Sequence, residues 1–384
     1  MLSGRQVTRF RKSLLAWFAE FRRDLPWRRT KDPYRIWLSE IMLQQTRVAA
    51  VIPYYERFLA HFPDVTALAE APEEEVLRLW AGLGYYSRAR NLQKAARKIV
   101  AEYDSRFPDS ESRALELSGI GQYTAAAILS IAYGKKLAVL DGNVARVLTR
   151  IGGIRGDLRA HGRWQKLQGL ADGFLAPQAP GEWNEAMMEL GATICAPRSP
   201  QCLVCPVAEF CEARRLGLTE SIPEKRKKRD GIDVTLAALV MVDNRELTLL
   251  LPPPRPSNTP AHGHDVAGLL ARMWHFPTIE VRQDAKSELQ SFSRKSLFLE
   301  GSLVSRLLPL SKVRHTVTYR SITMESFRLD LWKLPRIAGA KKLPLDEVSS
   351  VAVSGLTRKV ARAALAGPCR SRPKQSAGTS LLAF

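Results

Sequence analysis

The chain has 384 residues, 45% of them hydrophobic and 25% charged, which excludes a wholly disordered protein and predicts more than one domain. Its formal net charge of +20 favours a polyanionic partner, with nucleic acid ahead of an anionic membrane surface. We find no apolar run of about 18 residues and no export signal, so we expect a cytoplasmic protein that makes no membrane contact.

The first half of the chain has the pattern of successive helices. From Val7 to about Gly217, apolar residues recur at helical spacing and are interrupted by short Pro and Gly breaks. The predicted breaks lie at Asp32-Pro33, Phe62-Pro63, Gly82 to Gly84, Phe107-Pro108, Gly134 and Gly152-Gly153. We therefore predict an all-α region over residues 1–220, followed at 221–232 by a linker that contains the basic run Lys225 to Arg229.

The second half begins as a β-sheet. Val234 to Val242 and Glu246 to Leu251 are rich in strand-forming residues and flank a turn at Asp243-Asn244-Arg245, which predicts a hairpin. Further strands are expected at Leu297 to Val304, His315 to Val317 and Ser326 to Trp332, and a helix at Ser354 to Ala366. These elements predict a smaller α+β domain at 233–366, with a disordered tail at 367–384.

Four of the five cysteines form a C-x6-C-x2-C-x5-C pattern at Cys195, Cys202, Cys205 and Cys211. Because disulfides are rare in reducing compartments, this spacing indicates a metal site. Structural zinc usually joins two short-spaced pairs, whereas only Cys202 and Cys205 form such a pair here. The pattern therefore favours a [4Fe-4S] cluster over zinc, in a structural or redox role. The fifth cysteine, Cys369, carries no clear signal.

The segment Leu117-Ser118-Gly119-Ile120-Gly121 separates two helical patterns. Gly119 and Gly121 permit a tight turn whose backbone N–H groups point outward at a helix N-terminus. Such a turn binds a phosphate without reading sequence, so we predict a helix-hairpin-helix motif that contacts the DNA backbone.

This hairpin, the segment Asp141-Gly142-Asn143-Val144 and the four cysteines resemble the helix-hairpin-helix DNA glycosylases, which include endonuclease III and MutY. The resemblance spans roughly residues 7 to 215. Three further motifs resemble the adenine-removing MutY branch, namely Leu25-Pro26-Trp27-Arg28, Ser39 to Thr46 and Gly82 to Arg88. The resemblance implies a six-helix barrel plus an iron-sulfur helical domain. It also implies a monomer that removes adenine paired with 8-oxoguanine or guanine from double-stranded DNA.

Glu40 and Asp141 suit the chemistry of that reaction. Breaking an N-glycosidic bond develops positive charge on the sugar and negative charge on the base, which requires a protonated acid and an ionised carboxylate. The apolar surroundings of Glu40 in Ile36 to Leu43 would raise its pKa, so we assign it as the general acid. Asp141 would cap a helix from Val144 to Ile151 and stabilise the sugar cation. Helical spacing would put Gln44 on the face of Glu40.

Other site residues are implied by the family pattern. Asn143 and Glu185 would support the site, and Tyr123 would lie beside Asp141 near the sugar. In endonuclease III the position of Tyr123 is a Schiff-base lysine, so its phenol predicts base removal without β-elimination. Gln45, Leu83 and Tyr85 would fill the gap left by the flipped base and inspect its partner. Arg23, Trp27 and Arg28 would line the entrance for the adenine and its phosphate.

The C-terminal domain resembles the Nudix-like domain with which the MutY family recognises 8-oxoguanine. Its clearest mark is Leu269 to Glu280, and the glutamate-rich, magnesium-binding helix of working Nudix hydrolases is missing after it. The lesion-contacting Phe-Ser-His loop of the family corresponds to Val317-Thr318-Tyr319, where Thr318 keeps a hydroxyl and Tyr319 replaces the histidine. The final Leu381-Leu382-Ala383-Phe384 is a candidate anchor for a replication clamp.

Two alternatives remain open from the sequence. One is an endonuclease III-like pyrimidine glycosylase/lyase, which Tyr123 and the C-terminal domain disfavour. The other is a noncatalytic mismatch-binding protein, which the presence of both Glu40 and Asp141 disfavours.

Overall fold

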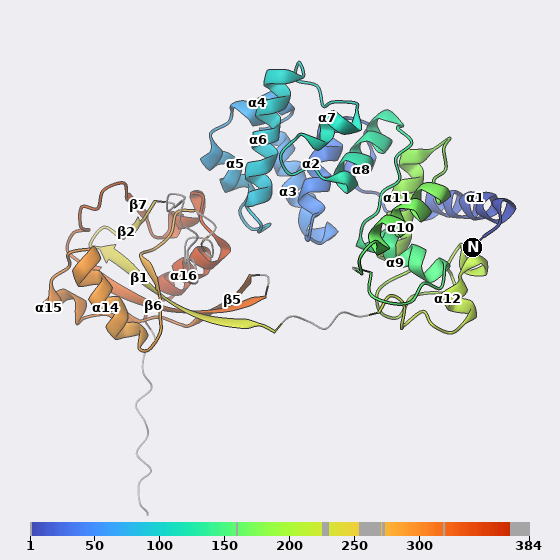
Figure 1. Ribbon diagram of the computed structural model, residues 1–384. Coiled ribbons are helices and arrows are strands. Elements are labelled where there is room, and N and C mark those ends of the chain that lie inside the picture. Colours follow the sequence, from blue (N-terminus) through green and yellow to red (C-terminus); the bar gives the residue numbers. More distant parts are fainter. Residues whose placement is uncertain are drawn as a thin grey trace, which may run out of the picture. The chain divides into compact units, whose positions relative to one another are not determined.

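The computed structural model describes residues 2–158, 160–224, 230–252, 270, 273–317 and 319–368 (Figure 1). The chain divides into two compact units, Met1–Lys228 and Arg229–Phe384. Several sequence predictions fall outside the described residues: those for the basic run at 225–229, for Thr318, for Cys369 and for the clamp-binding segment at 381–384. Among the described helices, none has the length and apolar character needed to cross a membrane.

The first unit is all-α over its described residues, as predicted. Every predicted break separates two helices. The helices are α1 (Gly4–Phe21), α2 (Pro33–Leu43), α3 (Val48–His61), α4 (Val65–Glu70), α5 (Glu73–Trp80), α6 (Ser87–Glu102), α7 (Glu111–Leu115), α8 (Gln122–Tyr133), α9 (Gly142–Ile151), α10 (Arg163–Phe174), α11 (Pro180–Thr193) and α12 (Glu212–Arg215), with short 3-10 turns η1 (Pro26–Arg28) and η2 (Ala208–Phe210).

Helices α2 to α8 form one group in the first unit, and α2 lies at its centre (Figure 1). It begins where Pro33 occupies the first turn and the Asp32 side chain accepts a hydrogen bond from the Tyr34 backbone N–H. Eight of its 11 residues are buried, including Trp37 and Glu40, because α3, α6 and α8 pack around it. Glu40 is therefore carried into the interior by the burial of its apolar neighbours.

Helix α11 connects this group to other helices of the first unit, because it packs against α8 of the group and against α1 and α9 outside it. A Cβ added at Gly191 would lie 2.7 Å from Asn143 Cβ, and one added at Gly181 would lie 2.8 Å from the backbone of Ile131. Only glycine fits at these crossings, so α11 lies directly against α8 at Gly181 and against the start of α9 at Gly191.

The predicted hairpin lies between α7 and α8. Gly119 has φ +82°, and a Cβ there would approach Asn91 Cβ to 2.9 Å. Gly121 is the N-cap residue of α8, and both glycines are exposed. The turn is thus accessible at a helix N-terminus, as the motif requires.

Over its described residues, the second unit is a seven-stranded sheet with helices on both faces. Its elements are β1 (Ile232–Asp243), β2 (Leu247–Leu250), β3 (Thr278–Glu280), α14 (Ala285–Ser296), α15 (Gly301–Val304), β4 (Leu308–Pro309), β5 (Val313–Val317), β6 (Arg320–Leu331), β7 (Lys341–Pro344), η3 (Asp346–Ser350) and α16 (Gly355–Leu365). The path of the sheet is β4-β6-β1-β2-β7, with β3 paired to β1 and β5 to β6.

Strand β1 is buried on both faces. Its even-numbered residues from Val234 to Val242 pack in one core with α16, whereas Ala237, Leu239 and Met241 pack in another with α14. Strand β6 lies parallel to it, and the β1–β2 hairpin is antiparallel as predicted.

One strand prediction was wrong. In the segment Leu297 to Val304, Leu297 is the C-cap residue of α14, and a short connection leads from it to α15. Leu297 and Leu299 both enter the same core cluster two residues apart, a spacing that looks like strand alternation. The helix α14, which we had not predicted, contains Glu288 as its only acidic residue.

Candidate active site

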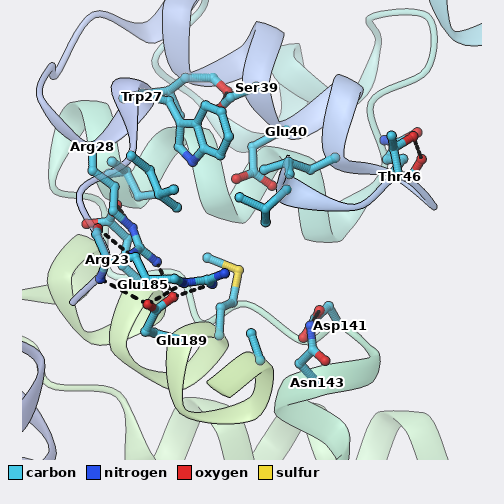
Figure 2. Close-up of a pocket in the computed structure, with 18 of the residues that line it drawn as sticks. Arg23, Trp27, Arg28, Ser39, Glu40, Thr46, Asp141, Asn143, Glu185 and Glu189 are labelled. Atoms are coloured by element: carbon cyan, nitrogen blue, oxygen red, sulfur yellow. Dashed lines mark hydrogen bonds and ion pairs between the residues drawn. The ribbon is translucent and has the colours of Figure 1, made fainter. Parts of the chain in front are cut away.

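A cavity of about 390 Å³ opens between α2, η1, α8, α9 and α11 of the first unit. Figure 2 shows Glu40 extending from α2, and Asp141 and Asn143 from the start of α9, around the same space. Its lining includes ten residues singled out in the sequence: Arg23, Trp27, Arg28, Glu40, Gln44, Gln45, Tyr123, Asp141, Asn143 and Glu185. Residues spread over more than half of this unit therefore meet at one cavity.

Glu40 is a buried carboxyl whose hydrogen-bond partner, among the residues that the structure describes, is Tyr123. Its side chain is 6% exposed, and Oε2 accepts a hydrogen bond of 2.7 Å from the Tyr123 hydroxyl. Burial raises the pKa of Glu40 to about 7, and the nearby carboxyls of Asp141 and Glu185 act in the same direction. The hydrogen bond from Tyr123 opposes that rise. A carboxyl in this state carries a proton on a large fraction of molecules at neutral pH.

Asp141 lies at the N-terminus of α9, where it is the N-cap residue, as predicted. Its Oδ1 accepts a hydrogen bond from the Val144 backbone N–H at 2.7 Å, and its Oδ2 accepts one from Asn143 Nδ2 at 3.0 Å. Both donors are directed at the carboxyl oxygens, and the positive end of the helix dipole lies beside them. Arg146 in turn donates to Asn143 Oδ1 at 2.9 Å, which fixes the orientation of the amide.

Tyr123 lines the same cavity as Asp141, but its hydroxyl donates to Glu40 and also lies 3.2 Å from Met188 Sδ. The sequence pattern placed it beside Asp141 and did not reveal the link to Glu40. Burial, followed by the charge of Glu40, raises the pKa of Tyr123 well above its ordinary value, so the phenol keeps its proton and remains a donor.

Glu189 is a site residue that the sequence analysis missed. It follows Glu185 by one helical turn on α11 and is almost fully buried. Arg23 donates to both of its carboxylate oxygens, through Nε at 2.7 Å and Nη2 at 2.6 Å, and Arg28 donates at 2.9 Å (Figure 2). Burial acts to raise the pKa of Glu189, but these two guanidinium groups lower it to about 2.

Arg23 and Arg28, which were expected near the adenine and its phosphate, form ion pairs with Glu189 in this structure. Arg28 also lies 3.6 Å from Glu185 Oε1, and burial raises the pKa of Glu185. Glu189 follows Glu185 at i,i+4 spacing, and this spacing is the sequence signal that could have identified Glu189 as a neighbour of the site. Trp27 is buried against Tyr55 and forms one wall of the cavity.

Residues 38–170 match the HhH-GPD superfamily of base excision DNA repair proteins. The human (Homo sapiens) adenine DNA glycosylase is 37% identical over 412 aligned residues, which cover 93% of this chain and 74% of the human protein. The mouse (Mus musculus) adenine DNA glycosylase is 35% identical, with 93% and 78% covered. The chain belongs to the adenine DNA glycosylase family.

As a member of that family, this protein is a base excision repair enzyme that hydrolyses the N-glycosidic bond of adenine in DNA. The predicted enzyme class is confirmed, and the noncatalytic alternative is not supported. A solved thermostable thymine-DNA glycosylase is 31% identical with a TM-score of 0.51, and the match covers 55% of this chain and 98% of that one. The helix-hairpin-helix glycosylase fold of the first unit is thereby confirmed.

The residues predicted to enter the DNA stack come from two loops of this glycosylase. Helix α2 ends at Leu43, and Gln44, which we predicted on the face of Glu40, is its C-cap residue. Gln44 and Gln45 line the same cavity as Glu40. Leu83 is buried at 7% exposure, which corresponds to a packing role, whereas Tyr85 is 40% exposed. Neither Leu83 nor Tyr85 lines the cavity.

The four cysteines of the glycosylase line a second, smaller cavity together with Arg150. None of the four forms a disulfide, and burial raises the pKa of the Cys205 and Cys211 thiols, that of Cys205 to about 11. Arg150 Nη1 lies 3.2 Å from Cys195 Sγ. Within the described residues, no group of three or more His, Cys, Asp or Glu is arranged to hold a metal ion. The donor set itself, four thiols around one cavity beside a cation, fits a cluster with thiolate ligands.

Proposed function

We propose that Glu40 and Asp141 perform adenine removal, Glu40 as the general acid and Asp141 as the stabiliser of the sugar cation. The observation that carries this proposal is the pair of carboxyl groups at one cavity in opposite environments. Glu40 is buried with a pKa raised to about 7, whereas Asp141 accepts two hydrogen bonds at a helix N-terminus.

The two groups divide the bond cleavage between them. Glu40 donates its proton to a ring nitrogen of the adenine, and the electrons of the C–N bond move to the departing base. The carboxylate of Asp141 stabilises the positive charge that develops on the sugar. Water then adds its hydroxyl to C1′ and releases a proton. The cavity of about 390 Å³ has room for a nucleobase.

A Glu40→Gln variant tests the acid assignment. We expect it to bind a duplex with adenine opposite 8-oxoguanine at wild-type affinity and to release no adenine in a single-turnover assay. Glu182→Gln, on an exposed residue at the start of α11, is the matched control and should release adenine at the wild-type rate. Unchanged release by Glu40→Gln would refute the assignment.

We also propose that the reaction stops at base removal. Tyr123 has no amine to form an imine with the sugar aldehyde, and none of the described residues that line the cavity is a lysine. Borohydride treatment during turnover should therefore trap no covalent protein–DNA complex. A trapped complex on nicked DNA would support the lyase alternative.

For the four cysteines we propose a [4Fe-4S] cluster held by Cys195, Cys202, Cys205 and Cys211. When bound, the cluster would supply the positive charge that keeps four buried thiolates ionised and would fix the loop around them. Arg150 and Arg146 already hold the backbone of this loop, since each donates to the Cys195 carbonyl. We expect iron and sulfide in equal amounts after anaerobic purification, lost in Cys202→Ser but kept in Cys369→Ser. Zinc in place of iron would contradict this assignment.

We propose that the second unit is a Nudix-like domain that selects adenine opposite 8-oxoguanine over adenine opposite guanine. The turn between β5 and β6 carries Tyr319, 39% exposed with the Arg320 guanidinium 5.0 Å from its ring centroid. The presence of a single glutamate in α14 argues against pyrophosphate hydrolysis in this unit. Thr318→Ala should lower the ratio of single-turnover rates on the two mispairs. An unchanged ratio would argue against the role of this turn.

A further inference from the structure

Arg88, near the start of α6, forms a hydrogen-bond network that the proposed mechanism does not use. Its side chain is buried, and its two terminal nitrogens serve different segments of the chain. Nη1 donates to the carbonyls of Ile41, Met42 and Gln44 at the end of α2. Nη2 donates to Thr46 Oγ1 at 3.1 Å and to the carbonyls of Leu83 and Gly84 at 3.3 and 3.2 Å.

The network therefore joins two loops, the first loop at Gln44–Thr46 and the second loop at Leu83–Tyr85. Each loop has one non-glycine residue in the left-handed region, Gln45 with φ 56° and Tyr85 with φ 49°. In both loops Arg88 binds the carbonyl of the residue that precedes the left-handed one, namely Gln44 and Gly84. The guanidinium thus holds both strained peptides in place.

An arginine suits this task better than any other side chain. Its planar fork presents two terminal nitrogens in fixed directions, whereas a lysine has a single nitrogen. Carbonyls at the end of α2 lack helical partners and lie at the negative end of the helix dipole, which favours a cation. Burial lowers the pKa of Arg88 to about 10, which leaves the group charged at neutral pH. The rings of Trp80 and Tyr85 lie 5.5 Å from the guanidinium carbon.

We propose that Arg88 is a positioning residue that locks Gln45 and Tyr85 into one arrangement, so that the two side chains engage DNA as a unit. The proposal rests on the proposed function and on the expectation from the family resemblance that Gln45 and Tyr85 fill the space left by the flipped adenine. Gln45 lines the cavity and Tyr85 is partly exposed, so both are available to a duplex. Their contributions to binding should therefore depend on each other.

A double-mutant cycle with the full chain tests this coupling. The probe is a duplex with a 2′-fluorinated adenosine, which resists glycosidic cleavage, opposite 8-oxoguanine. Dissociation constants are measured for Gln45→Ala, Tyr85→Ala and the double variant, in the wild-type and Arg88→Lys backgrounds. When Arg88 is present, the loss of affinity in the double variant should be about fivefold smaller than the two single losses multiplied together. In Arg88→Lys the two effects should simply multiply.

The control is Gln93→Ala on the same helix. Gln93 is also buried and donates to the carbonyls of Leu68 and Ala71, which belong to neither loop. It should lower the melting temperature and leave the coupling at its wild-type value. Coupling that persists in Arg88→Lys, or that also disappears in Gln93→Ala, would overturn the proposal.

If Arg88→Lys does not fold, Thr46→Val provides the same test because it removes only one of the Nη2 hydrogen bonds. It should reduce the coupling at a near-normal melting temperature, and undiminished coupling would again overturn the proposal. Failure of the proposed function is recognised separately, since it would appear as adenine release by Glu40→Gln.

Discussion

Replacing Tyr123 with phenylalanine is expected to move the pH dependence of adenine release upward. In the wild type Glu40 must be protonated to act, and its pKa is about 7, so the single-turnover rate should fall as pH rises through 7. The Tyr123 hydroxyl donates to Glu40 and stabilises its ionised form. Without that donor the carboxyl keeps its proton to a higher pH.

The size of the shift follows from the strength of this hydrogen bond. A hydrogen bond to a charged group contributes about 1.5–3 kcal/mol, and one pKa unit corresponds to about 1.4 kcal/mol. The descending limb of the pH profile should therefore move upward by about 1 to 2 units. The rate on the low-pH plateau should change little, because Glu40 is protonated there in both proteins.

The assay is single-turnover adenine release with enzyme in excess, measured from about pH 5.5 to 9.5. This range of about 4 pH units covers the descending limbs of the wild type and of Tyr123→Phe. Tyr133→Phe is the matched control, since Tyr133 lies on the same helix and donates to the Phe107 carbonyl outside the cavity. Its profile should coincide with that of the wild type. A limb that stays in place or moves downward in Tyr123→Phe would show that the hydroxyl does not control the Glu40 proton.

Three other substitutions have defined expectations. Glu189→Gln should lower the free energy of unfolding by about 3 kcal/mol in urea titrations, because Arg28 and Arg23 lose their counter-charge. Since the pKa of Glu189 is lowered to about 2, its contribution is complete above its ordinary pKa of 4.5 and is lost as pH falls toward 2. Asp141→Asn should cap α9 equally well and keep the melting temperature, while the rate drops by about 100-fold or more. Gly82→Ala should lower the melting temperature, because its Cβ would lie 1.9 Å from the Tyr54 hydroxyl, and Tyr54→Phe should restore part of the loss.

The sequence predicted the features that short-range chemistry determines. Pro33 and Asp32 mark the start of α2, and Asp141 caps α9 as its position before an apolar helix indicates. The burial of Glu40 followed from its apolar neighbours. In each case the signal and the structure that it determines lie within a few residues of each other.

Contacts between distant residues were beyond that reasoning. The ion pairs of Glu189 join α11 to Arg23 and Arg28, more than 150 residues earlier in the chain, and no local pattern encodes such a partner. The end of α2 at Leu43 coincides with the carbonyls that Arg88 binds, again from a separate helix. Tertiary contacts of this kind accompany the end of a helix, and helical periodicity alone does not specify them.

The crossing of α11 and α9 at Gly191 limits how this enzyme can vary. The space at that point holds a hydrogen atom and no methyl group, since a Cβ would be 2.7 Å from Asn143 Cβ. A larger residue would force the start of α9 away from α11 and shift the carboxylate of Asp141 with it. Displacements of about 1 Å at a reacting centre reduce rates by about 100-fold. A substitution at this interior position can therefore slow adenine removal about 100-fold, although Gly191 does not line the cavity.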